Sequence, residues 1–337
     1  MTHRAGAQRH FTTLATVLAL VGAVLFGLTA CTTTTDAERP SVVVTTNILG
    51  DITREVVGDQ AEVTVLMKAG ADPHSFGISA PQAARVEQAD LIVYNGLGLE
   101  ENVLRHVEAA REAGVAALAV GDGVAPLTYA ADDMAGRPDP HFWTDPTRVR
   151  TAVRLIADQL TEHVDGVDVS TVRANAARYD SRLADLTTWM SGRFAAIPEN
   201  KRNLVTNHHV FGYLAQRFGF HVIGAVIPSG TTLASPSASD LKSLATAIEA
   251  AGVTAIFADS SQPDRLAQVL KRESDVDVRV LPLFSESLTE QGRGAATYLE
   301  MMRANTTAIA DGLGAPTTAR PTAGTERNLN DRVKPSA

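Results

Sequence analysis

Two similar histidine motifs contain the side chains of this sequence that are best suited to metal chemistry. His74 lies in GADPHSF and His141 lies in DPHFWTDP, so both motifs contain the tripeptide Asp-Pro-His. Proline restricts the backbone ahead of each imidazole, which reduces the freedom that a ligand loses on binding. Asp-Pro is also a common turn dipeptide, so histidines that merely decorate loops are the alternative. The repetition within one half of the chain favours the ligand interpretation.

Further candidates lie in the second half of the chain. His208 and His209 follow the run Leu-Val-Thr at 204–206. Adjacent residues on extended backbone point to opposite sides, so only one of the two can face a cleft. Glu286 lies in LFSESL, just past another predicted strand, where a lone carboxylate is usually only solvated or helix-capping. Three neutral imidazoles and one carboxylate would make a closed ligand set of the kind that zinc accepts.

The other histidines and the single cysteine limit the remaining chemistry. Cys31 is the only cysteine, so neither an intramolecular disulfide nor a thiolate cluster can form. His106 and His163 lie in polar helical patterns and His221 begins a predicted strand, so we interpret all three as structural or surface residues.

The N-terminal residues are typical of an exported lipoprotein. Arg4 and Arg9 precede an apolar stretch over 11–28, and Leu-Thr-Ala comes directly before Cys31. This order predicts a signal peptide over 1–30, acylation of Cys31 and a polar tether over 31–40. A retained transmembrane anchor is the alternative, because this apolar stretch approaches the roughly 20 residues that span a bilayer. Both interpretations place the rest of the chain outside the cytoplasm, at the outer face of the cell membrane or in the periplasm.

Composition limits the classes of partner. Removal of residues 1–30 takes away two of the 30 Lys and Arg residues and none of the 38 Asp and Glu residues, so the net charge falls to about −10. A negative surface disfavours nucleic acid as a partner. The remaining chain is large for one core and is better accommodated in two lobes, and we expect a monomer.

Alternating strand and helix patterns must position the candidate residues. β-Branched or apolar runs alternate with segments of helical periodicity in both halves of the chain. The runs lie at 42–46, 63–67, 91–94, 115–120, 204–206, 222–226, 255–258 and 278–283. This alternation predicts an α/β fold with two similar lobes, each containing a parallel sheet of about four strands flanked by helices. Loops that follow such strands gather at a binding crevice, so we expect the metal site in the cleft between the lobes.

One predicted helix is long enough to join the lobes. Helical periodicity extends from Ser170 to Ala196, and neither Gly nor Pro interrupts it before Gly192. A stiff linker of this kind permits little hinge motion. The segment after Gly314 is rich in proline and poor in large apolar residues, which predicts disorder. The predicted boundaries are an N-terminal lobe over 41–169, a linker helix over 170–197, a C-terminal lobe over 198–314 and a disordered tail over 315–337.

With these motifs the sequence resembles the zinc- and manganese-binding lipoproteins of bacterial ABC importers. The likeness spans about residues 41–313 and rests on GADPHSF, DPHFWTDP, TNHHVFGYLAQRFGF and LFSESLTEQG in the family's order. It implies two α/β lobes joined by one rigid helix and no enzymatic activity. It also implies a permease and its ATPase as partners, and attachment to the membrane through Cys31. The implied metal ligands are His74, His141, His208 and Glu286, while His209 falls on a variable position.

The resemblance favours Zn²⁺ as the bound metal, with Mn²⁺ or Fe²⁺ as alternatives in the same role. Manganese-binding relatives typically replace one histidine with a carboxylate, and imidazole suits zinc better than it suits manganese. The sequence departs from many zinc-specific relatives because it lacks a long His- and acid-rich loop and a cysteine pair in the C-terminal lobe. Because the imidazoles must be neutral, we expect metal affinity to fall as the pH drops through the histidine range.

Two other function classes are less favoured. A zinc hydrolase would use Glu286 as a general base, but the sequence contains no HExxH motif. A surface adhesin receives no support from the negative net charge. Metal-bound histidines usually donate their second N–H to a carboxylate, and Asp72 and Asp139 are the candidates, although Pro73 and Pro140 could orient them away.

Overall fold

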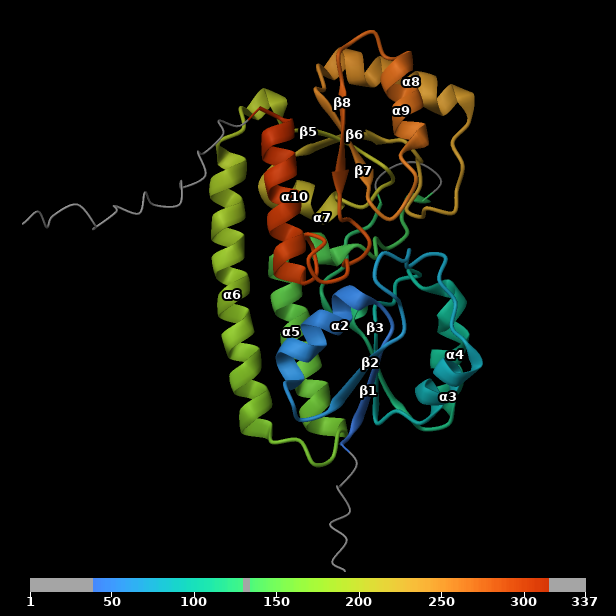
Figure 1. Cartoon of the computed structure of the whole chain (residues 1–337), viewed down its shortest axis with the longest axis vertical. Coiled ribbons are helices and arrows are strands. Elements are labelled where there is room, and N and C mark those ends of the chain that lie inside the picture. The colour runs from blue at the N-terminus through green and yellow to red at the C-terminus, as the bar shows by residue number, and fades with distance from the viewer. Residues whose placement is uncertain (1–38, 130–133, 315–337) are drawn as a thin grey trace, which may run out of the picture. The chain divides into compact units, whose positions relative to one another are not determined.

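The computed structural model describes residues 39–129 and 134–314 (Figure 1). The predicted signal peptide, Cys31, most of the predicted tether and the predicted tail lie outside these residues. Within the two described ranges, no helix is both long and apolar enough to cross a lipid bilayer.

Parallel sheets form the centres of two similar lobes in the described part of the chain. The N-lobe sheet has the order β2-β1-β3-β4, from β1 (Ser41–Val44), β2 (Glu62–Val65), β3 (Leu91–Tyr94) and β4 (Ala116–Ala119). The C-lobe sheet has the order β6-β5-β7-β8, from β5 (Asn203–Thr206), β6 (His221–Ala225), β7 (Ala255–Asp259) and β8 (Arg279–Leu283). The predicted fold class is confirmed, because the recurring apolar runs form equivalent strands in both lobes.

Helices cover both faces of each sheet. In the N-lobe, Val43 faces the side covered by α3 and α4, whereas its neighbours Val42 and Val44 face α2 and α5. In the C-lobe, Val205 packs toward α8 and α9, and Leu204 packs toward α7 and α10. The helices between strands are α2 (Asn47–Val57), α3 (Ala80–Glu87), α4 (Glu101–Glu112), α7 (Gly212–Phe218), α8 (Ala238–Ala251) and α9 (Arg265–Glu273). Short 3₁₀ segments are η1 (Val120–Gly123), η3 (Phe142–Thr144) and η4 (Glu199–Lys201).

One long helix, α6 (Val169–Ala195), runs along both lobes, beside α5 (Pro146–His163) of the N-lobe and α10 (Tyr298–Gly312) of the C-lobe (Figure 1). The Asp168 side chain caps the start of α6 by accepting a hydrogen bond from Thr171 N. Its buried residues recur at helical spacing: Val172, Asn175, Ala176, Tyr179, Leu183, Leu186, Met190 and Phe194. This face packs against α2 and α5 of the N-lobe and against α10 of the C-lobe. One cluster of buried apolar side chains therefore continues from one lobe into the other.

Candidate metal centre

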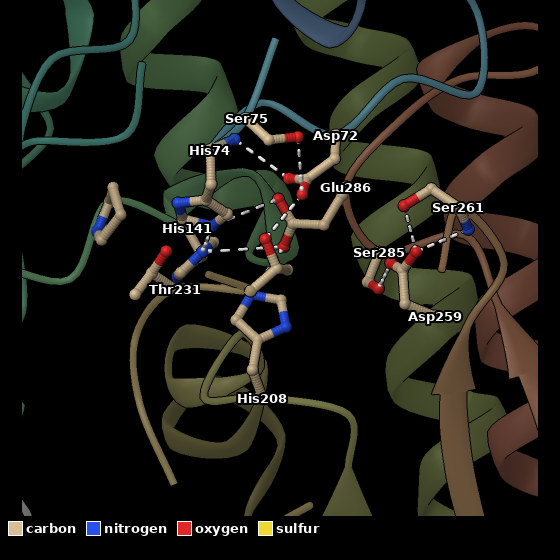
Figure 2. A network of polar contacts seen from close by, with 12 residues as sticks. Asp72, His74, Ser75, His141, His208, Thr231, Asp259, Ser261, Ser285 and Glu286 are labelled. Atoms are coloured by element: carbon tan, nitrogen blue, oxygen red, sulfur yellow. Dashed lines mark hydrogen bonds and ion pairs between the residues drawn. The ribbon is translucent and has the colours of Figure 1, made fainter. Parts of the chain in front are cut away.

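His74, His141, His208 and Glu286 converge between the two lobes (Figure 2). One potential ligand atom from each residue lies within 4.8 Å of those of the other three. His74 follows β2 and His141 precedes η3, whereas His208 follows β5 and Glu286 follows β8. Each lobe therefore contributes two of the four side chains. All four are buried, and the most exposed, His74, retains 4% of its accessible surface.

The four side chains lie close together without forming a complete hydrogen-bond network, an arrangement that suits a shared ion. His208 Nε2 lies 3.1 Å from Glu286 Oε1, and His141 Nε2 lies 3.6 Å from the same oxygen. The two N-lobe imidazoles approach each other at 3.3 Å between their Nε2 atoms. In the described part of the chain, His208 Nε2 and both Glu286 oxygens are buried without a hydrogen-bond partner. Buried polar atoms without partners are costly, and a divalent cation would satisfy all of them.

Asp139 fixes the orientation of His141. Its Oδ1 atom accepts a hydrogen bond from the His141 backbone N at 2.9 Å and lies 2.7 Å from His141 Nδ1. Tyr129 O–H donates to the same carboxylate oxygen at 3.3 Å. A carboxylate at Nδ1 favours the tautomer that carries its proton there, which leaves the Nε2 lone pair directed toward His74 and Glu286.

Asp72 occupies the equivalent position in the first Asp-Pro-His tripeptide but makes different contacts. Its carboxylate accepts from the His74 backbone N at 3.0 Å rather than from the imidazole. The same carboxylate also accepts hydrogen bonds from the C-lobe, from Thr232 Oγ1 at 2.6 Å and Gln262 Nε2 at 3.0 Å. Asp72 therefore joins the two lobes beside the site, whereas Asp139 contacts an imidazole directly.

Only one member of the His208–His209 pair reaches the centre. The His208 ring is fully buried and stands edge-on to His141 at 5.2 Å between ring centroids. The partly exposed His209 ring instead lies near Tyr129, at 6.4 Å between centroids. This arrangement matches the alternation expected of adjacent residues that follow a strand. The exposed side chains of His163 and His221 lie outside the four-residue cluster, as does His106.

Glu286 is placed by the residues that flank it. Ser285 Oγ donates to the buried Asp259 carboxylate at the end of β7, and Ser285 O accepts from Trp143 Nε1 at 2.9 Å. Asn47 at the start of α2 donates to Ser287 Oγ at 2.7 Å. Sequence reasoning did not select Asp259, Trp143 or Asn47. Asp259 ends β7 and Asn47 follows β1, so both lie at the carboxyl ends of central strands. That position would have identified them as candidates.

Residues 42–312 match the family described as zinc-uptake complex component A, periplasmic, ZnuA. The chain belongs to this family.

Individual relatives agree with this assignment. The chain is 30% identical over 311 residues to the manganese ABC transporter substrate-binding lipoprotein PsaA of Streptococcus pneumoniae, covering 89% of this chain and 98% of the relative. It is 31% identical over 310 residues to the metal ABC transporter substrate-binding lipoprotein FimA of Streptococcus parasanguinis, with the same coverage.

Solved structures show the same fold. The periplasmic zinc-binding protein TroA of Treponema pallidum superposes with a TM-score of 0.74 at 26% identity, covering 82% of this chain and 99% of TroA. A Mn-bound periplasmic metal-binding protein of Candidatus Liberibacter asiaticus gives a TM-score of 0.73 at 28% identity, covering 82% and 100%. This ZnuA-family protein is therefore the metal-binding, extracytoplasmic component of an ABC importer and not an enzyme.

Burial sets the protonation of the site in this ZnuA-family protein. Desolvation, together with the neighbouring His141 and His208, lowers the pKa of His74 to about 2. Desolvation also lowers the pKa of His208 to about 4, although the negative charge of Asp259 acts in the opposite direction. Desolvation raises the pKa of Glu286 to about 8, against the effect of His141. At neutral pH the imidazoles of His74 and His208 are therefore neutral in the absence of metal. The Glu286 carboxyl group is protonated, so a metal ion that binds must displace this proton.

Proposed function

We propose that this protein captures Zn²⁺ outside the cytoplasm and delivers it to the permease of an ABC importer, which an associated ATPase drives. The observation that carries this proposal is the buried set of three imidazoles and one carboxylate, in which His208 Nε2 and both Glu286 oxygens have no hydrogen-bond partner among the described residues. Zinc accepts four nitrogen and oxygen ligands in a tetrahedral arrangement, whereas manganese favours sites richer in oxygen. Zinc is therefore the proposed physiological metal.

In this proposal His74, His141, His208 and Glu286 bind the ion directly, and Asp139 orients His141. The contact of 2.7 Å between Asp139 and His141 Nδ1 supports the second role. Membrane attachment through acylated Cys31, which lies outside the described residues, is supported by the sequence Leu-Thr-Ala-Cys and by relatives that are named lipoproteins. We propose that the protein acts as a monomer.

The same transport role with Mn²⁺ or Fe²⁺ is the second candidate. It is favoured by the names of the relatives, since PsaA of Streptococcus pneumoniae and MntA of Halalkalibacterium halodurans are both described as manganese proteins. Against it stands the donor set of this chain, which has three nitrogens and one carboxylate. Competition between the metals decides between the two candidates.

The deciding experiment uses protein that begins after Cys31 and is purified under limiting, equimolar Zn²⁺, Mn²⁺ and Fe²⁺. We expect elemental analysis to find one Zn²⁺ per chain, and isothermal titration to give submicromolar affinity. Purified protein that contains mainly manganese would overturn the zinc assignment and leave the transport role intact. A His74→Ala/His141→Ala variant should lose tight binding, whereas His221→Ala, which removes an exposed histidine, should retain it. Submicromolar zinc binding in the double variant would contradict the assigned site.

A further inference from the structure

Glu286 is held in place by hydrogen bonds of its neighbours along the chain rather than by hydrogen bonds of its own carboxylate. Its two carboxylate oxygens have no hydrogen-bond partner among the described residues. The segment 284–288, here called the Glu286 loop, is instead bonded at several points. Asn305 donates to Phe284 O and accepts from Phe284 N, both at 2.9 Å. The position of the carboxylate therefore depends on what holds this loop.

Two of the residues that hold the Glu286 loop come from the N-lobe. Asn47 accepts from Leu288 N at 2.9 Å as well as donating to Ser287. Trp143 donates its indole N–H to Ser285 O, the carbonyl immediately before Glu286. These bonds place a C-lobe ligand by means of N-lobe side chains. Of these two residues, only Trp143 also lies next to an N-lobe ligand, His141.

Trp143 contacts residues of both lobes at the metal centre. It follows His141 by two residues, and its ring centroid lies 5.3 Å from that of His141. The side chain is 3% exposed, and its own carbonyl accepts a hydrogen bond from Tyr298 O–H at 2.7 Å. The backbone of η3 thus links His141 to an indole whose N–H reaches the residue next to Glu286.

We propose that Trp143 is a positioning residue, which sets the separation between His141 and Glu286 and keeps the donor atoms together before metal arrives. The inference rests on the proposed ligand roles of His141 and Glu286. A preformed set of donors loses less freedom on binding and so gives higher affinity for an ion that matches its size. Any separation of the lobes at this point breaks the Trp143–Ser285 hydrogen bond.

A packing role alone does not account for the geometry. An aromatic ring could fill the same space without an N–H directed at a backbone carbonyl. If the donor is removed, the buried Ser285 carbonyl loses this partner, and the loop that carries Glu286 gains freedom. The proposal therefore predicts that loss of the N–H alone, at constant volume, changes the metal site.

The test compares Trp143→Phe with the chemically matched Trp189→Phe in the purified protein. Trp189 lies on α6, where the Arg303 guanidinium stacks on its ring. Three properties are measured: Zn²⁺ affinity by chelator competition, the visible spectrum of the Co²⁺-substituted site, and amide hydrogen exchange of 284–288 without metal. For Trp143→Phe we expect binding that is about 10-fold to 100-fold weaker, the range found for residues that orient metal ligands. We also expect an altered Co²⁺ spectrum and faster exchange of the Glu286 loop, while Trp189→Phe retains wild-type values.

A second variant removes only the donor. The chain contains two tryptophans, so in the Trp189→Phe background global replacement of tryptophan by benzothienylalanine changes Trp143 alone. This analogue keeps the ring volume and replaces the N–H by sulfur. The proposal can therefore be tested even if Trp143→Phe fails to fold. We expect weaker Zn²⁺ binding and faster loop exchange.

The outcomes separate this inference from the proposed function. Wild-type affinity, Co²⁺ spectrum and exchange in the analogue would overturn the positioning role. Weaker binding with an unchanged spectrum and unchanged exchange would also overturn it, because only packing would then be involved. If the wild-type protein fails to bind Zn²⁺, Mn²⁺ or Fe²⁺, the proposed function fails. The exchange experiment without metal would still show whether Trp143 holds the Glu286 loop.

Discussion

His141 and His208 are held in the centre by different means. Asp139 contacts His141 Nδ1, whereas His208 Nδ1 has no hydrogen-bond partner within the described residues. The His208 ring is instead confined by packing, edge-on to His141 and to His74. The orientation of His141 is thus set by a specific polar contact, and the orientation of His208 is set by the rings around it.

Replacement of Asp139 by Asn tests the polar contact. The amide can still accept a hydrogen bond from the His141 backbone, but it no longer presents a negative charge to Nδ1. We expect Asp139→Asn to weaken Zn²⁺ binding about 10-fold to 100-fold, because the imidazole becomes less basic and less oriented. Chelator competition measures the change, with the exposed Asp277→Asn as the matched control. Equal affinity in the two variants would show that Asp139 does not support the ligand.

Glu286 should dominate the pH dependence of metal binding. Its pKa is raised to about 8 by burial, whereas the pKa values of His74 and His208 are lowered to about 2 and about 4. The metal binds the ionised carboxylate, so affinity should increase about tenfold per pH unit up to about pH 8 and then level off. This revises the expectation that the histidine range sets the response.

The measurement is proton release on binding, obtained by titration calorimetry in buffers of different ionisation enthalpy. At pH 7 we expect about one proton per Zn²⁺ from Glu286. Glu286→Gln should bind more weakly and release no proton. Release that persists in Glu286→Gln would assign the proton to another group.

At the scale of elements, a side chain of α2 in the N-lobe caps the start of α10 in the C-lobe. Asp51 on α2 accepts a hydrogen bond at 2.8 Å from the backbone N of Tyr298, the first residue of α10. Burial raises the pKa of Asp51 to about 6, and Glu55 adds to this effect. The folded state therefore holds this proton more tightly than the unfolded state does. Its contribution to stability is complete below about pH 4 and is lost as the pH rises to about 6.

Replacement of Asp51 by the uncharged Asn should remove this loss of stability at high pH. Its amide oxygen can still accept from Tyr298 N, so we expect Asp51→Asn to raise the free energy of unfolding at pH 8 by on the order of 2 kcal/mol. At pH 4 the variant should resemble the wild type. Urea unfolding of metal-free protein at both pH values measures the difference, with the exposed Asp59→Asn as control. Destabilisation at pH 8 would mean that the charged carboxylate is needed as the cap.

At the scale of the whole molecule, the described lobes share one core. The apolar cluster contains Val42 of the N-lobe sheet, Leu186 of α6 and Phe257 of the C-lobe sheet. Asp72 accepts a hydrogen bond from Thr232, and Asn47 accepts one from Leu288 N, and both bonds join the lobes beside the metal centre. We expect this continuity to limit independent motion of the lobes.

A shared core should make unfolding cooperative. We expect the metal-free protein to unfold in urea in a single transition, although it contains two sheets. In Trp189→Phe protein, the remaining tryptophan reports on the interlobe site, and far-UV circular dichroism reports on all helices. The two curves should coincide. A separate, earlier transition at Trp143 would show that the lobes part before either one unfolds.

The sequence by itself determined the local structure and the identity of the four clustered side chains. Apolar runs predict the strands because parallel strands in a covered sheet are buried on both faces. The helical spacing over 170–196 predicts a long linker, and the structure has α6 at Val169–Ala195. The resemblance, carried by short motifs, selected His208 over His209 and identified Glu286. All of these features depend on neighbours along the chain.

Only the tertiary structure decided what surrounds the four side chains. The two Asp-Pro-His tripeptides are identical, yet Asp139 contacts its imidazole and Asp72 binds the opposite lobe. Asn47 and Leu288 are 241 positions apart, and no local pattern relates them. The raised pKa of Glu286 likewise follows from burial by both lobes. Such contacts exist only after packing of the lobes, so the local sequence that specifies each element cannot specify them.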